Sequence, residues 1–180
     1  MIQLVTPPIQ YPVTLDEAKQ HLRIIDDAED AYIETLIGTG TDVAETITGR
    51  QLEPATYELT LDAFPAGPID LPRPPLRSVE RISYTDPNGV EQSFEDFELD
   101  TVRGRVLPDY GSHWPAARAA PNAVKVRFTC GYPTGETPFA IRSAILLLVG
   151  GLYENRESQT PHKLQENEAV GLLLWPYRVF

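Results

Sequence analysis

The feature that most restricts how this chain can fold is the segment 137–153, which predicts a helix that is apolar on nearly every side. Thr137 is placed to accept a backbone N–H as the N-cap, and Pro138 to occupy the first helical position, where no donor is needed. From Ile145 to Val149 the pattern has no polar face, so other protein must surround the helix. About fifteen residues with Arg142 among them are too few to span a bilayer. Either a large core or neighbouring copies of the chain must cover this helix.

Two further helices are predicted near the start of the chain, over about residues 14–25 and 28–48. Thr14 and Glu17 form a Ser/Thr-x-x-Glu capping box at the start of the first helix. Gly49 is expected to end the second helix in a left-handed conformation. The apolar positions expected to face the core are Leu15, Ala18, Leu22 and Ile25 in the first helix, and Ile33, Ile37, Val43, Ala44 and Ile47 in the second.

The same region carries most of the negative charge of the protein. Residues 14–48 hold nine acids against two bases, a net charge of −7, while the whole chain carries −11. The acidic run 26–30 is expected to supply an N-cap and a negative first turn for the second helix, which the helix dipole favours. So acidic a chain does not favour tight, sequence-independent binding to phosphate backbones. A large net negative charge suits a protein past which DNA slides, but taken alone this charge indicates no more than solubility.

Between about residues 56 and 130 the hydrophobic period changes to two, which is typical of strands. Tyr57, Leu59 and Leu61 alternate with polar residues, and the proline-dense segment 64–76 is expected to run along a sheet edge. Asp86–Gly89 predicts a hairpin turn. Further strands are expected at Val79–Tyr84, Val90–Phe94, Phe97–Val106 with a tight turn at 103–104, and Val124–Phe128. The predicted class is α+β: a small helical bundle (about 14–25, 28–48 and 138–154), a β-rich insertion (about 56–130) and a C-terminal arm with a short helix.

Patterns typical of catalysis or metal binding are absent from the sequence. It has no Gly-x-Ser-x-Gly, no phosphate-binding Gly-Lys-Ser/Thr loop and no His-Glu-x-x-His. The three histidines (His21, His113 and His162) lack the spacing of a zinc site. Cys130, the only cysteine, is expected to be a small buried residue. We therefore expect no catalytic residue, no cofactor and no metal. A small cytoplasmic enzyme with two converging acids is the weakest interpretation.

Several segments occur in an order that is informative when they are taken together. They are Leu15–Arg23, Ile69–Tyr84, Asp86–Gly89, Trp114–Pro115, Val126–Pro133, Ala144–Val149 followed by Tyr153–Glu157, and a closing Pro176–Arg178. In this order, over nearly the whole chain, they resemble the head–tail connector (adaptor) family of tailed bacteriophages, which also occurs in prophages and gene transfer agents.

The resemblance implies a structural virion protein without catalysis or cofactor. Such proteins form a ring of about twelve copies beneath the portal, join the DNA-filled head to the tail and extend the DNA channel. The implied partners are the portal protein, a neck or tail-completion (stopper) protein and identical copies. DNA passes without specific binding, and no membrane is involved. The implied location is the virion neck, assembled in the host bacterial cytoplasm. The alternative is another neck ring, a stopper or tail terminator.

The implied organisation is a single connector domain over residues 1–180. It comprises a helical core (12–50 and 137–158), a β-rich insertion (55–132) and a C-terminal arm (159–180). Two hypotheses concern particular residues in it. In the first, the arm docks onto an adjacent subunit or the portal through Leu173, Trp175, Tyr177, Arg178 and Phe180, because aromatic side chains often dominate interfaces. Its alternative is an arm that folds back on its own domain. In the second, Asp26, Asp27 and Asp30 line the channel and repel DNA, against the alternative of an outer solvated face.

Overall fold

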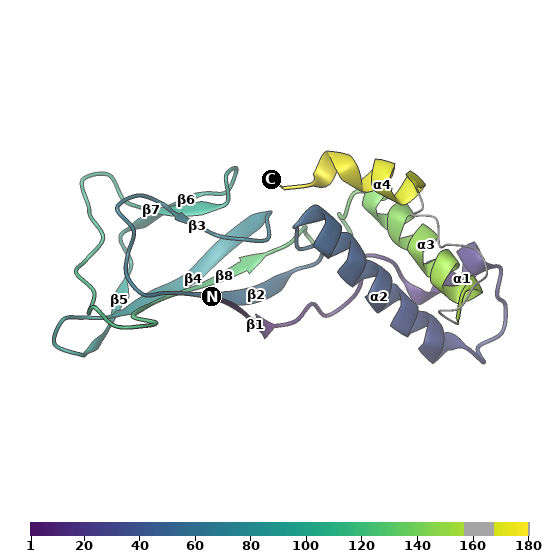
Figure 1. Cartoon of the computed structure of the whole chain (residues 1–180), viewed down its shortest axis with the longest axis horizontal. Coiled ribbons are helices and arrows are strands. Elements are labelled where there is room, and N and C mark those ends of the chain that lie inside the picture. The colour runs from purple at the N-terminus through teal and green to yellow at the C-terminus, as the bar shows by residue number, and fades with distance from the viewer. Residues whose placement is uncertain (157–167, 180) are drawn as a thin grey trace. The chain divides into compact units, whose positions relative to one another are not determined.

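The computed structural model describes residues 1–156 and 168–179, which form two compact units (Figure 1). The β-rich unit contains Met1–Pro8 and Pro54–Tyr132, and the helical unit contains Ile9–Glu53 and Pro133–Phe180. The predicted α+β class, with a helical bundle and a β-rich region, is confirmed. That all 180 residues act as one connector domain stays a prediction.

A five-stranded antiparallel sheet forms the larger part of the β-rich unit, in the order β1-β2-β8-β4-β5. Its central strand β8 alternates as expected, with Val126 and Phe128 fully buried and Lys125 exposed. Arg127 lies on the face opposite Val126 and Phe128, where it is half-buried and its guanidinium pairs with Glu58 on β2 at 2.8 Å. The strands are β1 (Ile2–Thr6), β2 (Ala55–Leu61), β4 (Leu76–Thr85), β5 (Glu91–Phe94) and β8 (Val124–Cys130).

A second, three-stranded sheet has the order β3-β7-β6, with β3 (Ile69–Asp70), β6 (Phe97–Asp100) and β7 (Arg105–Pro108). The short strand β3 comes from the proline-dense segment and lies at the sheet edge, as predicted, because proline cannot donate to a ladder. Buried residues of both sheets, among them Ile69, Val106 and Phe128, make one core. Phe64 and Trp114 stack beside this core with ring centroids 5.0 Å apart.

Strand β1 is an element that the sequence analysis does not predict. Ile2–Thr6 pairs antiparallel with β2, so residues 1–8 belong to the β-rich unit although they precede the helices. All five residues of β1 are exposed. Because burial leaves no alternating pattern on such a strand, only its pairing with a segment more than fifty residues away reveals it.

Helices α1 (Leu15–Leu22) and α2 (Asp30–Thr48) are both shorter at one end than predicted. The capping box of Thr14 and Glu17 is confirmed. The prediction that the first helix reaches residue 25 is wrong, because Arg23 takes a left-handed conformation (φ 60°) and ends it. Ile25 lies beyond that stop and is 96% exposed, so it does not join the buried stripe.

The start of α2 also differs from the prediction, whereas its end does not. The acidic run 26–30 supplies the N-cap, Glu29, and the acidic first-turn residue, Asp30, as predicted, but Glu29 makes no side-chain capping bond. Asp26 instead accepts the Ala28 N–H at 3.1 Å within the preceding turn. Gly49 ends α2 with φ 69°, as predicted. Ile33, Ile37 and Ala44 are buried, and Val43 and Ile47 are half-buried.

Helix α3 (Phe139–Glu154) packs against α1, α2 and the short terminal helix α4 (Glu168–Leu174). Ile145 and Val149 are fully buried, while the side chains of Leu146–Leu148 remain half-buried. Its own unit therefore covers much of the apolar surface but not all of it. The predicted N-cap role of Thr137 is wrong: its hydroxyl donates to the Leu52 carbonyl at 2.9 Å, and Pro138 is the N-cap.

A charged and aromatic cluster joins the end of α3 to the start of α2. Tyr153 and Arg156 both donate to the Glu29 carboxylate, and their hydrogen bonds, led by that of Tyr153, hold the pKa of Glu29 below its usual value. The Arg156 guanidinium lies 4.8 Å from the ring centroid of Tyr32 and 4.7 Å from that of Tyr153. These contacts give the Tyr153–Arg156 motif a structural role in the bundle.

Candidate partner-binding groove

The C-terminal segment folds back along α2 and α3 within the helical unit. Its helix α4 is followed by a 3₁₀ turn η1 (Trp175–Tyr177), and Val170 and Leu174 are buried. The Arg50 side chain donates to the Tyr177 carbonyl at 2.6 Å, and the Val179 N–H donates to the Thr48 carbonyl at 2.9 Å. A helix of seven residues is unstable alone, so these contacts define its position.

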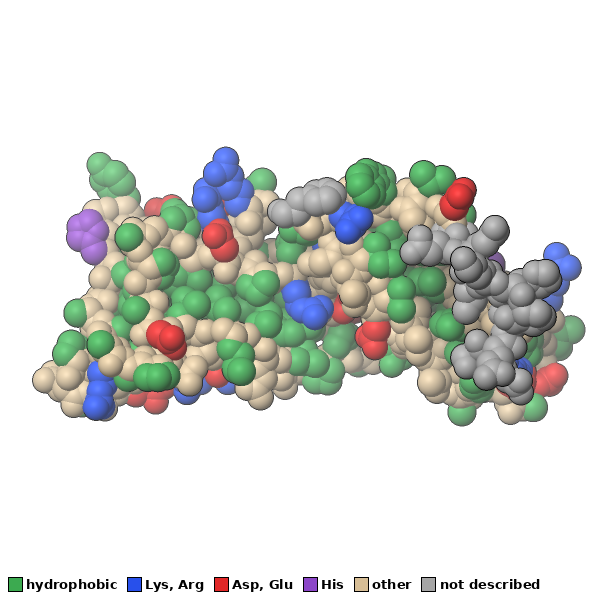
Figure 2. Space-filling model, viewed as in Figure 1, with side chains coloured by type: hydrophobic (Ala, Val, Ile, Leu, Met, Phe, Trp, Pro, Cys, Tyr) green, Lys and Arg blue, Asp and Glu red, His purple; other side chains and the backbone are tan. Residues whose placement is uncertain are grey.

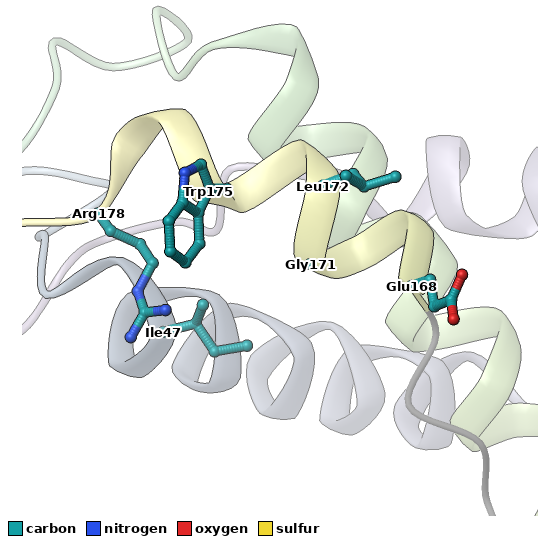
Figure 3. A pocket seen from close by; sticks show the side chains of 6 residues that line it. All are labelled: Ile47, Glu168, Gly171, Leu172, Trp175 and Arg178. Atoms are coloured by element: carbon teal, nitrogen blue, oxygen red, sulfur yellow. The ribbon is translucent and has the colours of Figure 1, made fainter.

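An open groove of about 370 Å³ lies between this segment and the C-terminal end of α2 (Figure 3). Trp175, Arg178 and Ile47 converge there, and the Arg178 guanidinium lies 5.3 Å from the centroid of a Trp175 ring. Trp175 is 60% exposed and Leu172 76% exposed. The groove is lined by Ile47, Glu168, Gly171, Leu172, Trp175 and Arg178.

The side chains that line this groove are of the types found at docking sites for other proteins. Its wall is mostly apolar, and its two charged side chains, Glu168 and Arg178, can fix the orientation of a bound segment. Aromatic and arginine side chains are the residue types that contribute most at protein interfaces. Large apolar side chains such as Trp175 and Leu172 are stabilised when a partner removes them from water.

The structure separates the residues that the sequence analysis grouped as partner-binding. Trp175 and Arg178 line the groove, while Leu173 and Tyr177 are half-buried against their own unit. Phe180 lies outside the described residues. In the isolated chain, residues 168–179 therefore pack on their own helical unit, which is the alternative to an arm that docks elsewhere. Their binding role stays a prediction.

Sequence reasoning missed Leu172, Ile47, Glu168 and Gly171 as groove residues. For Leu172 a signal existed: the buried pair Val170 and Leu174 is spaced i, i+4, which places Leu172 on the opposite side of a helix. For Ile47 there was none, because an apolar residue on a helix stripe is expected to be core.

The three aspartates of the acidic hypothesis do not lie together as free charges. Lys19 on α1 donates to Asp27 at 2.5 Å and to Asp30 at 2.7 Å, which joins α1 to the start of α2. The hydrogen bond from Lys19 lowers the pKa of Asp27, and these two bonds raise the pKa of Lys19. Asp26 is exposed. That these residues line a channel stays a prediction.

A buried carboxylate, that of Glu53, lies in the segment that follows the C-terminal end of α2. Glu53 is 2% exposed, and burial raises the pKa of its carboxyl, although hydrogen bonds from Thr137 and the Gly135 backbone and the charge of Arg142 act in the other direction. Its Oε2 atom has no hydrogen-bond partner among the described residues. The Arg142 side chain itself pairs with Glu17.

Replacing Glu53 with Gln is expected to stabilise the protein at neutral pH. Because the folded-state pKa is raised above the usual 4.5, the folded chain binds this proton more tightly than the unfolded chain, so the stability contribution falls as pH rises from 4.5 through the folded pKa. Thermal melts of E53Q and wild type from pH 4 to pH 8 should diverge as pH rises. Glu34→Gln, which removes an exposed charge from α2, is the matched control. A lower melting midpoint for E53Q at pH 8 would mean that attraction to Arg142 outweighs burial.

Residues 1–156 and 168–179 contain no group of three or more His, Cys, Asp or Glu side chains that could hold a metal ion. No helix in these two ranges is long and apolar enough to cross a membrane.

Comparison with known proteins identifies the class. The sequence profile of phage gp6-like head-tail connector proteins matches residues 12–101, half of the chain. The chain therefore belongs to the phage gp6-like head-tail connector family, a class of structural proteins at the junction of head and tail. No curated protein matches it.

Solved structures match the whole fold. A chain in the virion of a native gene transfer agent (GTA) particle superposes with a TM-score of 0.83 at 22% identity, covering 100% of this chain and 96% of that chain. A chain in the neck of an empty GTA particle computed with C6 symmetry gives 0.82 at 21% identity, and one in the neck of a native GTA particle computed with C12 symmetry gives 0.81 at 22% identity. Each of these two matches also covers 100% of this chain and 96% of the matched chain.

Proposed function

We propose that this protein forms a ring of about twelve copies beneath the portal, where it joins the DNA-filled head to the tail and extends the DNA channel. The family match over residues 12–101 carries the proposal. The resemblance to a chain in a neck with C12 symmetry supports the copy number. The half-buried leucines 146–148 of α3 support close contact between copies, because neighbouring copies would cover them.

The groove at the C-terminal segment is the proposed contact with the portal. Leu172 and Trp175 supply apolar anchors, and Arg178 and Glu168 supply charges at its border. The opposite end of the ring is proposed to receive the stopper or another neck or tail-completion protein.

Mixing the purified protein with the portal of the same particle tests this function. We expect a stable complex in which electron microscopy shows a second ring coaxial with the portal. Binding to a tail-side neck protein without any binding to the portal would instead assign the chain to a stopper or tail-terminator ring. A protein that binds neither would contradict the proposal altogether.

Reversing the charge of Asp26, Asp27 and Asp30 to Lys is expected to slow DNA ejection severalfold if these residues line the channel, because lysines attract the phosphates that aspartates repel. Ejection from assembled particles can be followed with a DNA-binding dye. The control is D27N with D30N, which removes the ion pairs to Lys19 without adding positive charge. Unchanged ejection in the charge-reversed particle would place these residues on an outer face.

A further inference from the structure

Strand β1 presents an unpaired backbone edge. The Thr60 N–H donates to the Met1 carbonyl at 2.8 Å, so Met1 and Thr60 are a hydrogen-bonded pair of the antiparallel ladder. Such pairs alternate with non-bonded ones, which makes Gln3–Glu58 the next bonded pair. The N–H and C=O groups of Ile2 and Leu4 therefore point away from β2. In the part of the chain that the structure describes, these outward groups have no hydrogen-bond partner.

The side chains of this edge are not of the kinds that keep edge strands apart in solution, and its register irregularity lies only between Leu4 and Thr6, at the end of the strand. Residues 2–6 contain no charge and no proline, and all five are exposed. Ile2, Leu4 and Val5 are 36%, 45% and 41% exposed. Natural proteins protect free edges with lysine, proline or a covering element, so an unprotected apolar edge indicates an interface.

The opposite edge of the same sheet, β5, has a matching arrangement. The Asp86 N–H donates to the Val90 carbonyl at 2.8 Å in the hairpin, so the register puts Glu91 and Ser93 in non-bonded pairs, with their N–H and C=O groups pointing outward. Like Ile2 and Leu4, they are spaced i, i+2. Val90, 53% exposed, and the half-buried Phe94 provide apolar surface beside this edge.

The side chains at the two edges lie on the same face of the sheet. Ile2 and Leu4 are directly opposite Leu59 and Tyr57, and Phe94 is directly opposite Ile82. Tyr57 and Ile82 belong to the core, and Leu59 and Phe94 pack against it. Figure 2 shows hydrophobic side chains spread over the visible face of the β-rich unit.

We propose that β1 of one copy adds to β5 of the next, so that the sheet continues from subunit to subunit. The two edges differ, so the contact is head-to-tail, as a cyclic ring requires. Four antiparallel steps separate β1 from β5, so both strands run in the same direction and neighbours related by rotation join in parallel. Because Glu91 and Ser93 carry the outward groups, the join places either Ile2 or Leu4 directly beside Gln92 of the next copy, with Val90 and Phe94 on either side of it. The inference rests on the proposed ring and identifies its subunit contact.

Cysteine cross-linking in the full-length protein tests the contact. Ile2→Cys or Leu4→Cys is combined with Gln92→Cys, which the register places on the same face of the sheet. Cys130 is fully buried and stays in place. After mild oxidation, alone and with portal, we expect a ladder of cross-linked multimers on a non-reducing gel for at least one pair. Gln3→Cys with Gln92→Cys, on opposite faces, should give none.

The outcomes distinguish this inference from the proposed function. Rings in electron micrographs without a ladder from either pair would overturn the β1–β5 contact and leave the ring intact. Dimers from Leu4→Cys alone would indicate a two-fold β1–β1 contact and also overturn it. A protein that forms neither rings nor ladders, with or without portal, would contradict both.

A proline variant supplies an independent measurement. Leu4→Pro removes an outward N–H but no bond to β2, so the ladder within the subunit is retained. We expect it to abolish ring formation without a large drop in melting temperature. Leu4→Ala, which keeps the N–H, should still form rings. Equal ring formation by L4P and wild type would overturn the inference.

Discussion

Replacing Leu172 and Trp175 together by alanine is expected to weaken portal binding by roughly a thousandfold, because each interface anchor contributes about 2 kcal/mol. Both side chains are mostly exposed in the isolated chain, at 76% and 60%, so the fold should lose little stability. The dissociation constant can be measured with immobilised portal. The fraction of heads joined to tails can be counted in micrographs of particles assembled with the variant.

The matched control is Ile25→Ala, which truncates another exposed apolar residue of the helical unit outside the groove. It should bind portal like the wild type. Substitution is a sharper test than deleting the C-terminal segment, because deletion also removes the buried Val170 and Leu174 and uncovers the surfaces of α2 and α3. If particles with the double variant join heads to tails normally, the groove is not part of the portal interface.

Local signals in the sequence predicted much of the fold, because the groups that interact lie close together along the chain. The capping box of Thr14 and Glu17 depends on residues three apart. Gly49 ends α2 because glycine tolerates φ 69° without steric cost. The Asp86–Gly89 turn and the alternation of β8 are likewise local, and each appears where it was predicted.

The predictions failed where a distant partner competes for a local group. Thr137 has the right identity for an N-cap, but its hydroxyl bonds Leu52, 85 residues away in sequence. The acids at the start of α2 are suited to a side-chain cap, yet Glu29 makes no capping bond, and Asp27 and Asp30 pair with Lys19 on another helix. No propensity or spacing reveals such bonds, because they exist only once the tertiary fold has formed.

The candidate groove was predicted only in part for a related reason. Trp175 and Arg178 stood out by residue type, and both line it. Leu173 and Tyr177 have equally suitable side chains but are half-buried against their own unit, because the segment packs on α2 and α3. Residue type thus indicates binding capacity, whereas the packing of α4 and η1 on their own unit decides which side chains are available.

Replacing Phe128 with alanine is expected to destabilise the β-rich unit by about 3–5 kcal/mol, because the variant loses a large buried side chain and leaves a cavity. Phe128 is fully buried in the central strand β8, where its ring lies 6.1 Å from that of Tyr57. Cys130, on the same strand and also fully buried, reports opening of this unit. The rate at which a thiol reagent labels it in the native protein should rise by roughly a hundredfold or more.

The control is Phe139→Ala, the same substitution at a side chain that is 82% exposed. It should change stability by about 0.5 kcal/mol or less and leave the labelling rate near that of wild type. Equal labelling rates in F128A and F139A would contradict a core centred on β8. Fast labelling of Cys130 in F128A, but not in F139A, would show that the packing between the two sheets protects Cys130 from the reagent.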